Sequence, residues 1–186
     1  MVKAKEIKQI ELKKKIKAVF EVDRVSAEIS DESTLMYDRS RFGERVGEKY
    51  QYSLVEGVFL FETKRMEAKD GRGKKLKFDD LVKKAKKQDK NFWVKYNVFK
   101  DLRSRGYVVK TALKFGAEFR VYDRGIKPGE DHAKWIVYPV HESNVTTWYE
   151  FAAKNRVAHS TRKRLLIGVM DEESEVSYWE VSWIRP

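Results

Sequence analysis

The sequence predicts a mixed α/β fold in two domains, and three observations support this prediction. Hydrophobic residues make up 41% of the 186-residue chain and aromatic residues 13%, which is enough apolar material for folded cores. Hydrophobic periodicity changes repeatedly between strand-like and helix-like segments. The composition changes near residue 91, because all five Trp and all three Pro lie at or beyond Trp93. We therefore expect a small N-terminal α/β domain at 1–91 and a C-terminal domain at 92–186, where helices flank a mixed β-sheet.

The first half contains strand, turn and helix patterns in succession. Ile16–Ile29 alternates between apolar and polar residues and predicts one or two strands. Ser53–Glu62 carries apolar residues at helical spacing and predicts a short helix. We expect turns at Arg41–Gly47 and Asp70–Gly73, where glycines are frequent. Phe78 opens a further helix, whose first turn holds two acids that complement the helix dipole.

The second half combines two helices with several strands. Phe92–Arg105 has aromatic residues at steps of three and four and predicts a helix that Gly106 ends. Thr147–Val157 predicts a second helix, with its threonine as the N-cap. The predicted strands are Tyr107–Lys110, Ala117–Tyr122, Trp135–Val140, Leu165–Met170 and Val176–Ile184.

Composition excludes several classes of protein. The chain has no cysteine, which excludes disulfides, thiolate zinc sites and a cysteine nucleophile. No apolar run approaches the roughly 18 residues that a membrane span requires. The lysine-rich segment 1–17 lacks the apolar core of a signal peptide. We expect a soluble, cytoplasmic protein without a membrane partner.

The charge balance favours a polyanionic partner. The chain has 40 Lys+Arg against 29 Asp+Glu, which gives a net charge of +11. Basic proteins of this size often bind nucleic acid. The alternative is a highly charged surface without a specific partner, because 37% charged residues with few Asn and Gln are also typical of heat-adapted proteins.

Metal and cofactor sites are not expected. The chain has only three histidines: His132, His141 and His159. The carboxylates that adjoin them in sequence point to the opposite face of a strand, which makes poor ligand pairs. No phosphate-binding glycine loop and no G-x-S-x-G motif occurs.

Three segments present proton-active or cationic groups at the ends of predicted elements. Tyr122 ends a strand, His132 lies where the following loop returns to the next strand, and a basic run occupies a helix-to-strand junction at 156–166. Functional sites usually lie at such positions. Each feature alone has a simpler interpretation: a packed tyrosine, a solvated histidine and a solvated basic surface.

These segments resemble the archaeal tRNA-splicing endonuclease (tRNA-intron lyase) family. The matching segments are FGAEFRVY at 115–122, DHAKWIV at 131–137 and RVAHSTRKRLLIGVMD at 156–171. The segment YNVFKDLRSRGYVVKTALKFG at 96–116 also matches, whereas the first 90 residues match only loosely. The resemblance implies a restriction-endonuclease-like C-terminal domain, precursor tRNA as substrate, and no metal or other cofactor.

The resemblance implies three catalytic residues and a reaction. Tyr122, His132 and Lys163 fall on the family's tyrosine, histidine and lysine. The family uses the 2′-hydroxyl of RNA to attack the scissile phosphate, which leaves a 2′,3′-cyclic phosphate and a 5′-hydroxyl. His132 suits the general acid because imidazole titrates near neutrality, and Lys163 suits charge stabilisation. The ordinary pKa of a tyrosine side chain is about 10, so little phenolate exists at neutral pH. Tyr122 therefore acts as a base only if neighbouring cations favour its phenolate, and otherwise it only orients the 2′-hydroxyl.

The resemblance also implies residues for RNA binding and assembly. The family grips a base of a bulge-helix-bulge substrate between two cations, which match Arg156 and Arg185. The family assembles through an acidic loop, and the matching residues here are Asp171, Glu172, Glu173 and Glu175. Two symmetry-related sites require self-association as a dimer or homotetramer, or a heterotetramer with a structural paralogue.

Three alternatives to a catalytic endonuclease fit the sequence less well. A non-catalytic paralogue should lack one of the three groups, and this chain keeps them all. An RNA-binding module would not require them in these positions. A metal-dependent nuclease would need a carboxylate cluster, and the only dense one has unfavourable spacing: Asp123, Glu130, Asp131 and Lys134.

Overall fold

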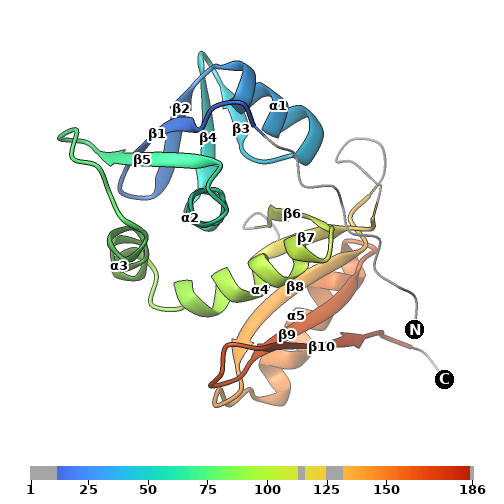
Figure 1. The fold of residues 1–186 in the computed structure, drawn as a ribbon. Coiled ribbons are helices and arrows are strands. Elements are labelled where there is room, and N and C mark those ends of the chain that lie inside the picture. Colours follow the sequence, from blue (N-terminus) through green and yellow to red (C-terminus); the bar gives the residue numbers. More distant parts are fainter. Residues whose placement is uncertain (1–11, 113–115, 125–131, 185–186) are drawn as a thin grey trace. The chain divides into compact units, whose positions relative to one another are not determined.

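The computed structural model describes residues 12–112, 116–124 and 132–184, and these residues form two five-stranded sheets and five helices (Figure 1). This content confirms the predicted mixed α/β class. The first sheet belongs to a unit that ends at Tyr96, and the second to a unit that begins at Asn97. This division falls inside helix α4 (Phe92–Ser104). The domain boundary predicted at residue 91 stays a prediction.

The first unit is built on a mixed sheet with the strand order β3-β4-β2-β1-β5. Strand β1 is antiparallel to β2 and parallel to β5, and its alternation buries Ile16, Ala18 and Phe20. The elements are β1 (Ile16–Phe20), β2 (Arg24–Glu28), α1 (Asp31–Ser40), β3 (Glu44–Val46), β4 (Lys49–Ser53), α2 (Leu54–Glu62), β5 (Met66–Asp70) and α3 (Phe78–Gln88).

Helix α2 begins with a capping box and packs closely on the first sheet. The Ser53 hydroxyl accepts a hydrogen bond from the backbone N–H of Glu56, and the Glu56 carboxylate accepts one from the backbone N–H of Ser53. The buried Glu56 carboxylate also accepts a hydrogen bond from the backbone N–H of Gly43. A Cβ on Gly57 would lie 2.5 Å from Val25 Cγ2, so glycine permits this close helix–sheet contact.

The structure corrects two details of the first half. The segment predicted as a turn at 41–47 contains the short edge strand β3. All three residues of β3 are exposed, so they show no alternation. Helix α1 was not predicted, because only two of its ten residues are buried.

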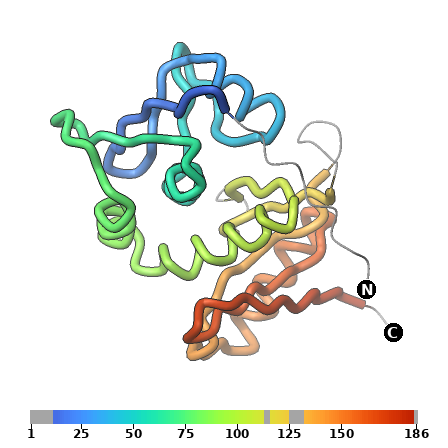
Figure 2. Tube along the Cα trace, viewed as in Figure 1, coloured from blue at the N-terminus to red at the C-terminus, as the bar shows by residue number. Residues whose placement is uncertain are grey.

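The second unit is built on a sheet with the strand order β10-β9-β8-β7-β6. Only the pair β8 and β9 is parallel, and α5 forms the crossover between them. Figure 2 follows this crossover along the chain. The elements after α4 are β6 (Val108–Thr111), β7 (Phe119–Tyr122), β8 (Trp135–His141), α5 (Trp148–Ser160), β9 (Arg164–Met170) and β10 (Val176–Val181), the last of which is three residues shorter than predicted.

Helices cover both faces of the second sheet (Figure 1). On one face Ile136, Tyr138 and Leu165 pack with Ala158 of α5. On the other face α4 approaches closely at Gly168, where an added Cβ would lie 3.0 Å from Val98. The sheet is therefore packed on both faces, and it supports the groups that lie at the ends of its strands.

None of the helices within the described residues is long and apolar enough to cross a membrane.

Candidate active site

A row of backbone hydrogen bonds joins three strands of the second sheet at one end. The N–H of Lys134 donates to the carbonyl of Val121 at 2.9 Å, and the N–H of Arg164 donates to the carbonyl of Lys134 at 3.0 Å. The same row aligns Trp135 with Val121 on one side and with Arg164 on the other. The three predicted catalytic residues all lie within two positions of this row: Tyr122, His132 and Lys163.

Tyr122 is the last residue of β7 and is only 5% exposed. It pairs with Val108 of the edge strand β6, which fixes its backbone. Side chains two positions apart on a strand share a face, so Arg120 and Tyr122 lie on the same side of the sheet. The sheet thus holds a phenol and a guanidinium next to each other on its α5 side.

His132 lies two residues before the hydrogen-bonded row and is exposed. An ion pair supports the backbone near it, because Lys134 Nζ donates to Asp123 Oδ2 at 2.9 Å. This hydrogen bond lowers the pKa of the Asp123 carboxyl. The ion pair joins the residue after Tyr122 to the second residue after His132, so it keeps these two segments together.

Lys163 is positioned by the way in which α5 ends. Arg162 adopts a left-handed conformation with φ of 55°, and the N–H of Lys163 donates to the carbonyl of Ala158 at 2.8 Å. The chain therefore reverses sharply, and Lys163 lies immediately before β9. Lys163 Nζ donates to the carbonyl of Thr161 at 2.8 Å.

Two cations share this end of the sheet. Partial burial lowers the pKa of Lys163, and the nearby positive charge of Arg120 lowers it further. Arg120 Nε is buried and has no hydrogen-bond partner among the residues described. Two like charges held close together in this way favour an anion between or beside them.

Arg120 has a charge interaction with Lys163, and the Arg124 guanidinium lies 4.9 Å from the ring centroid of Tyr107. The two-residue spacing of Arg120 and Tyr122 on a strand was the signal for their shared face. The sequence carried no signal for the proximity of Arg120 to Lys163, because the strand order creates it.

Of the two arginines predicted to bind RNA, the structure describes one, Arg156. Arg156 is exposed on the last turns of α5, seven residues before Lys163. Arg185 lies outside the described residues.

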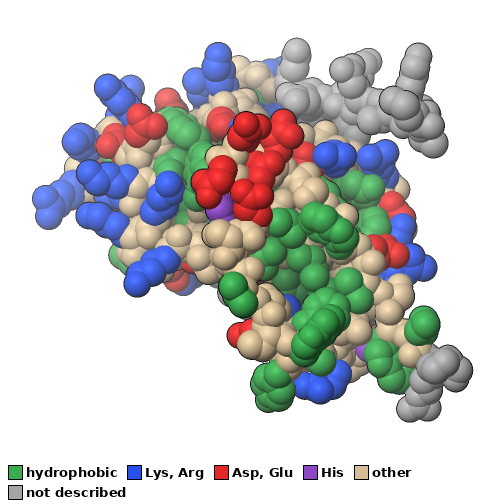
Figure 3. Space-filling model, turned by 90° about the horizontal axis from the view of Figure 1, so that it is seen from below, with side chains coloured by type: hydrophobic (Ala, Val, Ile, Leu, Met, Phe, Trp, Pro, Cys, Tyr) green, Lys and Arg blue, Asp and Glu red, His purple; other side chains and the backbone are tan. Residues whose placement is uncertain are grey.

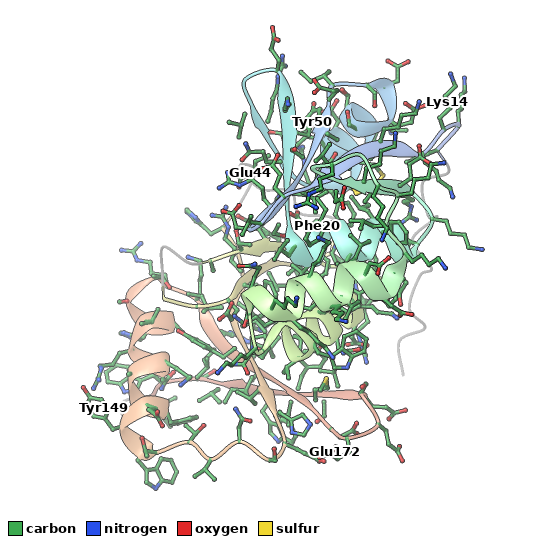
Figure 4. All side chains as sticks on the ribbon, turned by 90° about the vertical axis from the view of Figure 1, so that its left-hand side faces the viewer. Lys14, Phe20, Glu44, Tyr50, Tyr149 and Glu172 are labelled. Carbon is green, nitrogen blue, oxygen red and sulfur yellow. The ribbon has the colours of Figure 1, made fainter. Side chains whose placement is uncertain are left out.

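The acidic turn Asp171–Glu175 lies at the opposite end of β9 from Lys163. A seven-residue strand separates them, which corresponds to about 23 Å. Asp171 Oδ1 accepts a hydrogen bond from the N–H of Glu175, while Glu172, Glu173 and Glu175 are exposed. Figure 4 shows Glu172 at the tip of the hairpin formed by β9 and β10. The acidic turn is therefore separate from the candidate active site.

The residues that the structure describes contain no group of three or more His, Asp or Glu side chains that could hold a metal ion. Two members of the sequence cluster considered for a metal, Glu130 and Asp131, lie outside those residues. Of the remainder, Asp123 is paired with Lys134.

Comparison with known proteins covers both units. A family model described as the tRNA intron endonuclease catalytic C-terminal domain matches residues 92–178, which include all three predicted catalytic residues. The model of the N-terminal domain of the same family matches residues 16–82.

Curated relatives match over most of their length. A tRNA-splicing endonuclease from Thermococcus onnurineus is 40% identical over 88% of this chain and 93% of its own. Proteins of the same name from Pyrococcus horikoshii and Nanoarchaeum equitans are 37% and 42% identical, over 94% and 78% of this chain and 99% and 97% of their own. The segments that carry Tyr122, His132 and Lys163 thus lie within a domain that the family shares, and the chain belongs to the archaeal tRNA-splicing endonuclease family.

Proposed function

We propose that the chain is a tRNA-splicing endonuclease that cleaves precursor tRNA at the bulge-helix-bulge motifs bordering introns, without a metal ion or other cofactor. The observation that carries this proposal is the position of Tyr122, His132 and Lys163 beside one hydrogen-bonded row of the second sheet. Residues that bear a phenol, an imidazole and an ammonium group thus lie within two chain positions of the same row. These are the kinds of group that an internal phosphoryl transfer requires.

The reaction consumes no water. The 2′-hydroxyl gives its proton to the phenolate of Tyr122, or to solvent if Tyr122 only orients it. The 2′-oxygen bonds to the scissile phosphorus, while the bond from phosphorus to the 5′-oxygen breaks. The departing 5′-oxygen takes up a proton from His132. The products are a 2′,3′-cyclic phosphate and a 5′-hydroxyl, so the enzyme is a lyase. Tyr122 acts on the attacking 2′-hydroxyl, either as the base or by orienting it.

The positive charges of Lys163 and Arg120 stabilise the transition state. Negative charge accumulates on the phosphoryl oxygens as the new bond forms, and preorganised cations in a partly buried site favour this charge more than solvated ones do. The charge interaction of Arg120 with Lys163 and the partial burial of Lys163 support this role.

Cleavage of matched RNAs tests the proposal. The purified chain should cut an end-labelled RNA with a bulge-helix-bulge motif at both bulges, and it should leave a fully paired RNA of the same length intact. Equal cutting of both RNAs would contradict the proposed substrate. If the assembled enzyme, as a self-associated oligomer or together with a structural paralogue, cut neither RNA, the proposed activity would be contradicted.

Arg156 is expected to act through binding of a bulge base. Arg156→Ala should weaken cleavage by roughly tens of fold, because stacking on one base is worth about 1–3 kcal/mol. Arg156→Lys should recover little, since lysine keeps the charge but loses the planar guanidinium. Single-turnover rates with bulged RNA measure both variants. Full activity of the lysine variant would exclude stacking as the role of Arg156.

Self-association is supported by an exposed apolar surface in the second unit. Trp148 and Tyr149 at the start of α5 are 84% and 78% exposed, and Trp179 of β10 is more than half exposed. Figure 4 shows Tyr149 projecting from α5, and Figure 3 shows hydrophobic side chains next to one another on the face turned toward the viewer. Exposed patches of this kind mark interaction sites. The partner we propose is a second copy or a structural paralogue.

The acidic turn is expected to contribute to assembly. Replacement of its four acids by Asn and Gln should leave the fold intact, because an asparagine in place of Asp171 can still accept the hydrogen bond from the N–H of residue 175. The loss of four negative charges should weaken docking on a basic partner surface and shift tetramers toward dimers. Sedimentation at moderate salt measures the mass. An unchanged mass together with full activity would identify the turn as a solvated hairpin.

A further inference from the structure

A basic groove lies on α3 in the first unit, whereas the candidate active site belongs to the second. The groove has a volume of about 580 Å³. Lys83, Lys86 and Lys87 line it, together with the apolar side chains of Val82 and Trp93. In Figure 3, Lys and Arg side chains gather on the left of the view. Figure 1 draws α3 and the turn after β5 on the same side.

The helical repeat of α3 explains why these lysines converge. Each of residues 79, 82, 83, 86 and 87 lies three or four positions from at least one other member of this set, so they occupy one face of the helix. The buried residues of α3, Leu81 and Ala85, lie on another face. The lysines therefore lie on a face of α3 that does not pack into the hydrophobic core. Asp79 is the single acidic residue among those that line the groove.

Trp93 supplies a half-buried aromatic wall to the groove. Its ring lies 5.7 Å from the Tyr96 ring, centroid to centroid, and Tyr96 is fully buried. Lys86 Nζ lies 5.0 Å from the centroid of the Trp93 ring. The Trp93 ring thus packs against a buried tyrosine on one side, and it contacts the Lys86 ammonium group at the groove.

We propose that this groove binds a single-stranded segment of the substrate RNA, with phosphodiester groups against the three lysines and one base against Trp93. The inference rests on the proposed function, since it names a second contact of the same substrate. Unpaired bases stack on aromatic side chains while lysines follow the backbone, and this combination is typical of single-strand binding.

The mixed chemistry of the groove favours RNA over the acidic turn of another copy. That turn, Asp171–Glu175, offers four carboxylates and a serine but no flat apolar group for Trp93. RNA offers negative charge and flat rings at every nucleotide. Binding of the acidic turn is the competing outcome of the experiment.

Two triple variants with equal loss of charge test the proposal. In the groove variant, Lys83, Lys86 and Lys87 are replaced by glutamine. In the control variant, Lys77, Lys84 and Lys90 are replaced by glutamine, because these exposed lysines of the same region do not line the groove. The affinity of each full-length protein for bulge-helix-bulge RNA with single-stranded extensions is measured across a range of salt concentrations, independently of cleavage.

The groove variant should reduce the slope of log affinity against log salt by about 2, because each phosphate contact to a single strand contributes about 0.7. The control variant should change the slope by less than half as much. In steady state the groove variant should raise KM more than it lowers kcat. Equal slopes for both triples would overturn the proposal, since general charge would then explain the binding.

A second substitution separates stacking from charge. Trp93→Leu keeps all three lysines, so it should weaken binding of the extended RNA by roughly tenfold and that of a blunt duplex much less. Trp93→Phe should restore part of the loss. If the groove variant instead loses self-association on sedimentation while its salt slope stays at the wild-type value, the groove binds the acidic turn and the proposal is wrong. If the wild-type protein binds the RNA and the groove variant weakens this binding as expected, but the wild-type protein does not cleave, the proposed function is contradicted and this inference stands.

Discussion

Replacing His132 by alanine is expected to lower the rate of RNA cleavage by about 10²–10⁴-fold, the usual loss on removal of a general acid. The 5′-oxygen would then leave as an unprotonated alkoxide, which is a poor leaving group. RNA binding should stay near the wild-type level, because His132 is exposed and the ion pair of Asp123 with Lys134 keeps the neighbouring backbone in place. Single-turnover rates and equilibrium binding of the same RNA measure the two effects.

The other two histidines provide matched controls for His132. His141 Nδ1 lies 2.8 Å from Ser143 Oγ at the end of β8, and the centroids of the His159 and Trp183 rings are 4.5 Å apart. Alanine at either position should cost much less than at His132. A substrate with a 5′-thio leaving group needs no acid, so it should restore much of the lost rate. Absence of any such rescue would contradict the acid role.

Replacing Lys163 by alanine is expected to lower the cleavage rate by about 10²–10³-fold, the usual loss of one preorganised charge. The loss should fall on kcat rather than on KM, because the charge is needed most as the transition state forms. Lys163→Arg should keep part of the activity, since it retains the charge but changes the geometry at the turn that ends α5. A variant that changed KM alone would contradict this role.

The pH dependence of cleavage gives a second readout for Lys163. Partial burial and the charge of Arg120 hold its pKa below the ordinary lysine value of 10.5. Lysine is positive only below its pKa, so the wild-type rate on the 5′-thio substrate, which needs no acid from His132, should fall as pH rises, and this fall should begin at lower pH than for an ordinary lysine. Arginine stays charged throughout, so Lys163→Arg should lose this alkaline limb. Rates are corrected for cleavage of the RNA without enzyme.

Local signals predicted much of the second unit. Thr147 is the N-cap of α5, and its hydroxyl accepts a hydrogen bond from the N–H of Glu150, as expected for a threonine before a helical pattern. Gly106 has a positive φ after the end of α4, as expected for a terminating glycine. Both features depend on neighbours within a few residues, which is the range over which sequence patterns report structure.

Other features depend on contacts between distant segments, and the sequence did not reveal them. Strand β3 forms only because β4 offers a partner, since its own three side chains are all exposed. The proximity of Arg120 to Lys163 depends on the order β7-β8-β9, which no local pattern contains. The three predicted catalytic residues were located through family motifs, and their roles stay predictions.

The proposed roles of Tyr122, His132 and Lys163 all depend on cleavage of RNA by internal attack without a metal. The most direct measurement is cleavage of a bulge-helix-bulge RNA in excess EDTA, followed by analysis of both new ends. We expect undiminished cutting that leaves a 2′,3′-cyclic phosphate and a 5′-hydroxyl. An absolute requirement for Mg²⁺, or products with a 5′-phosphate, would contradict it.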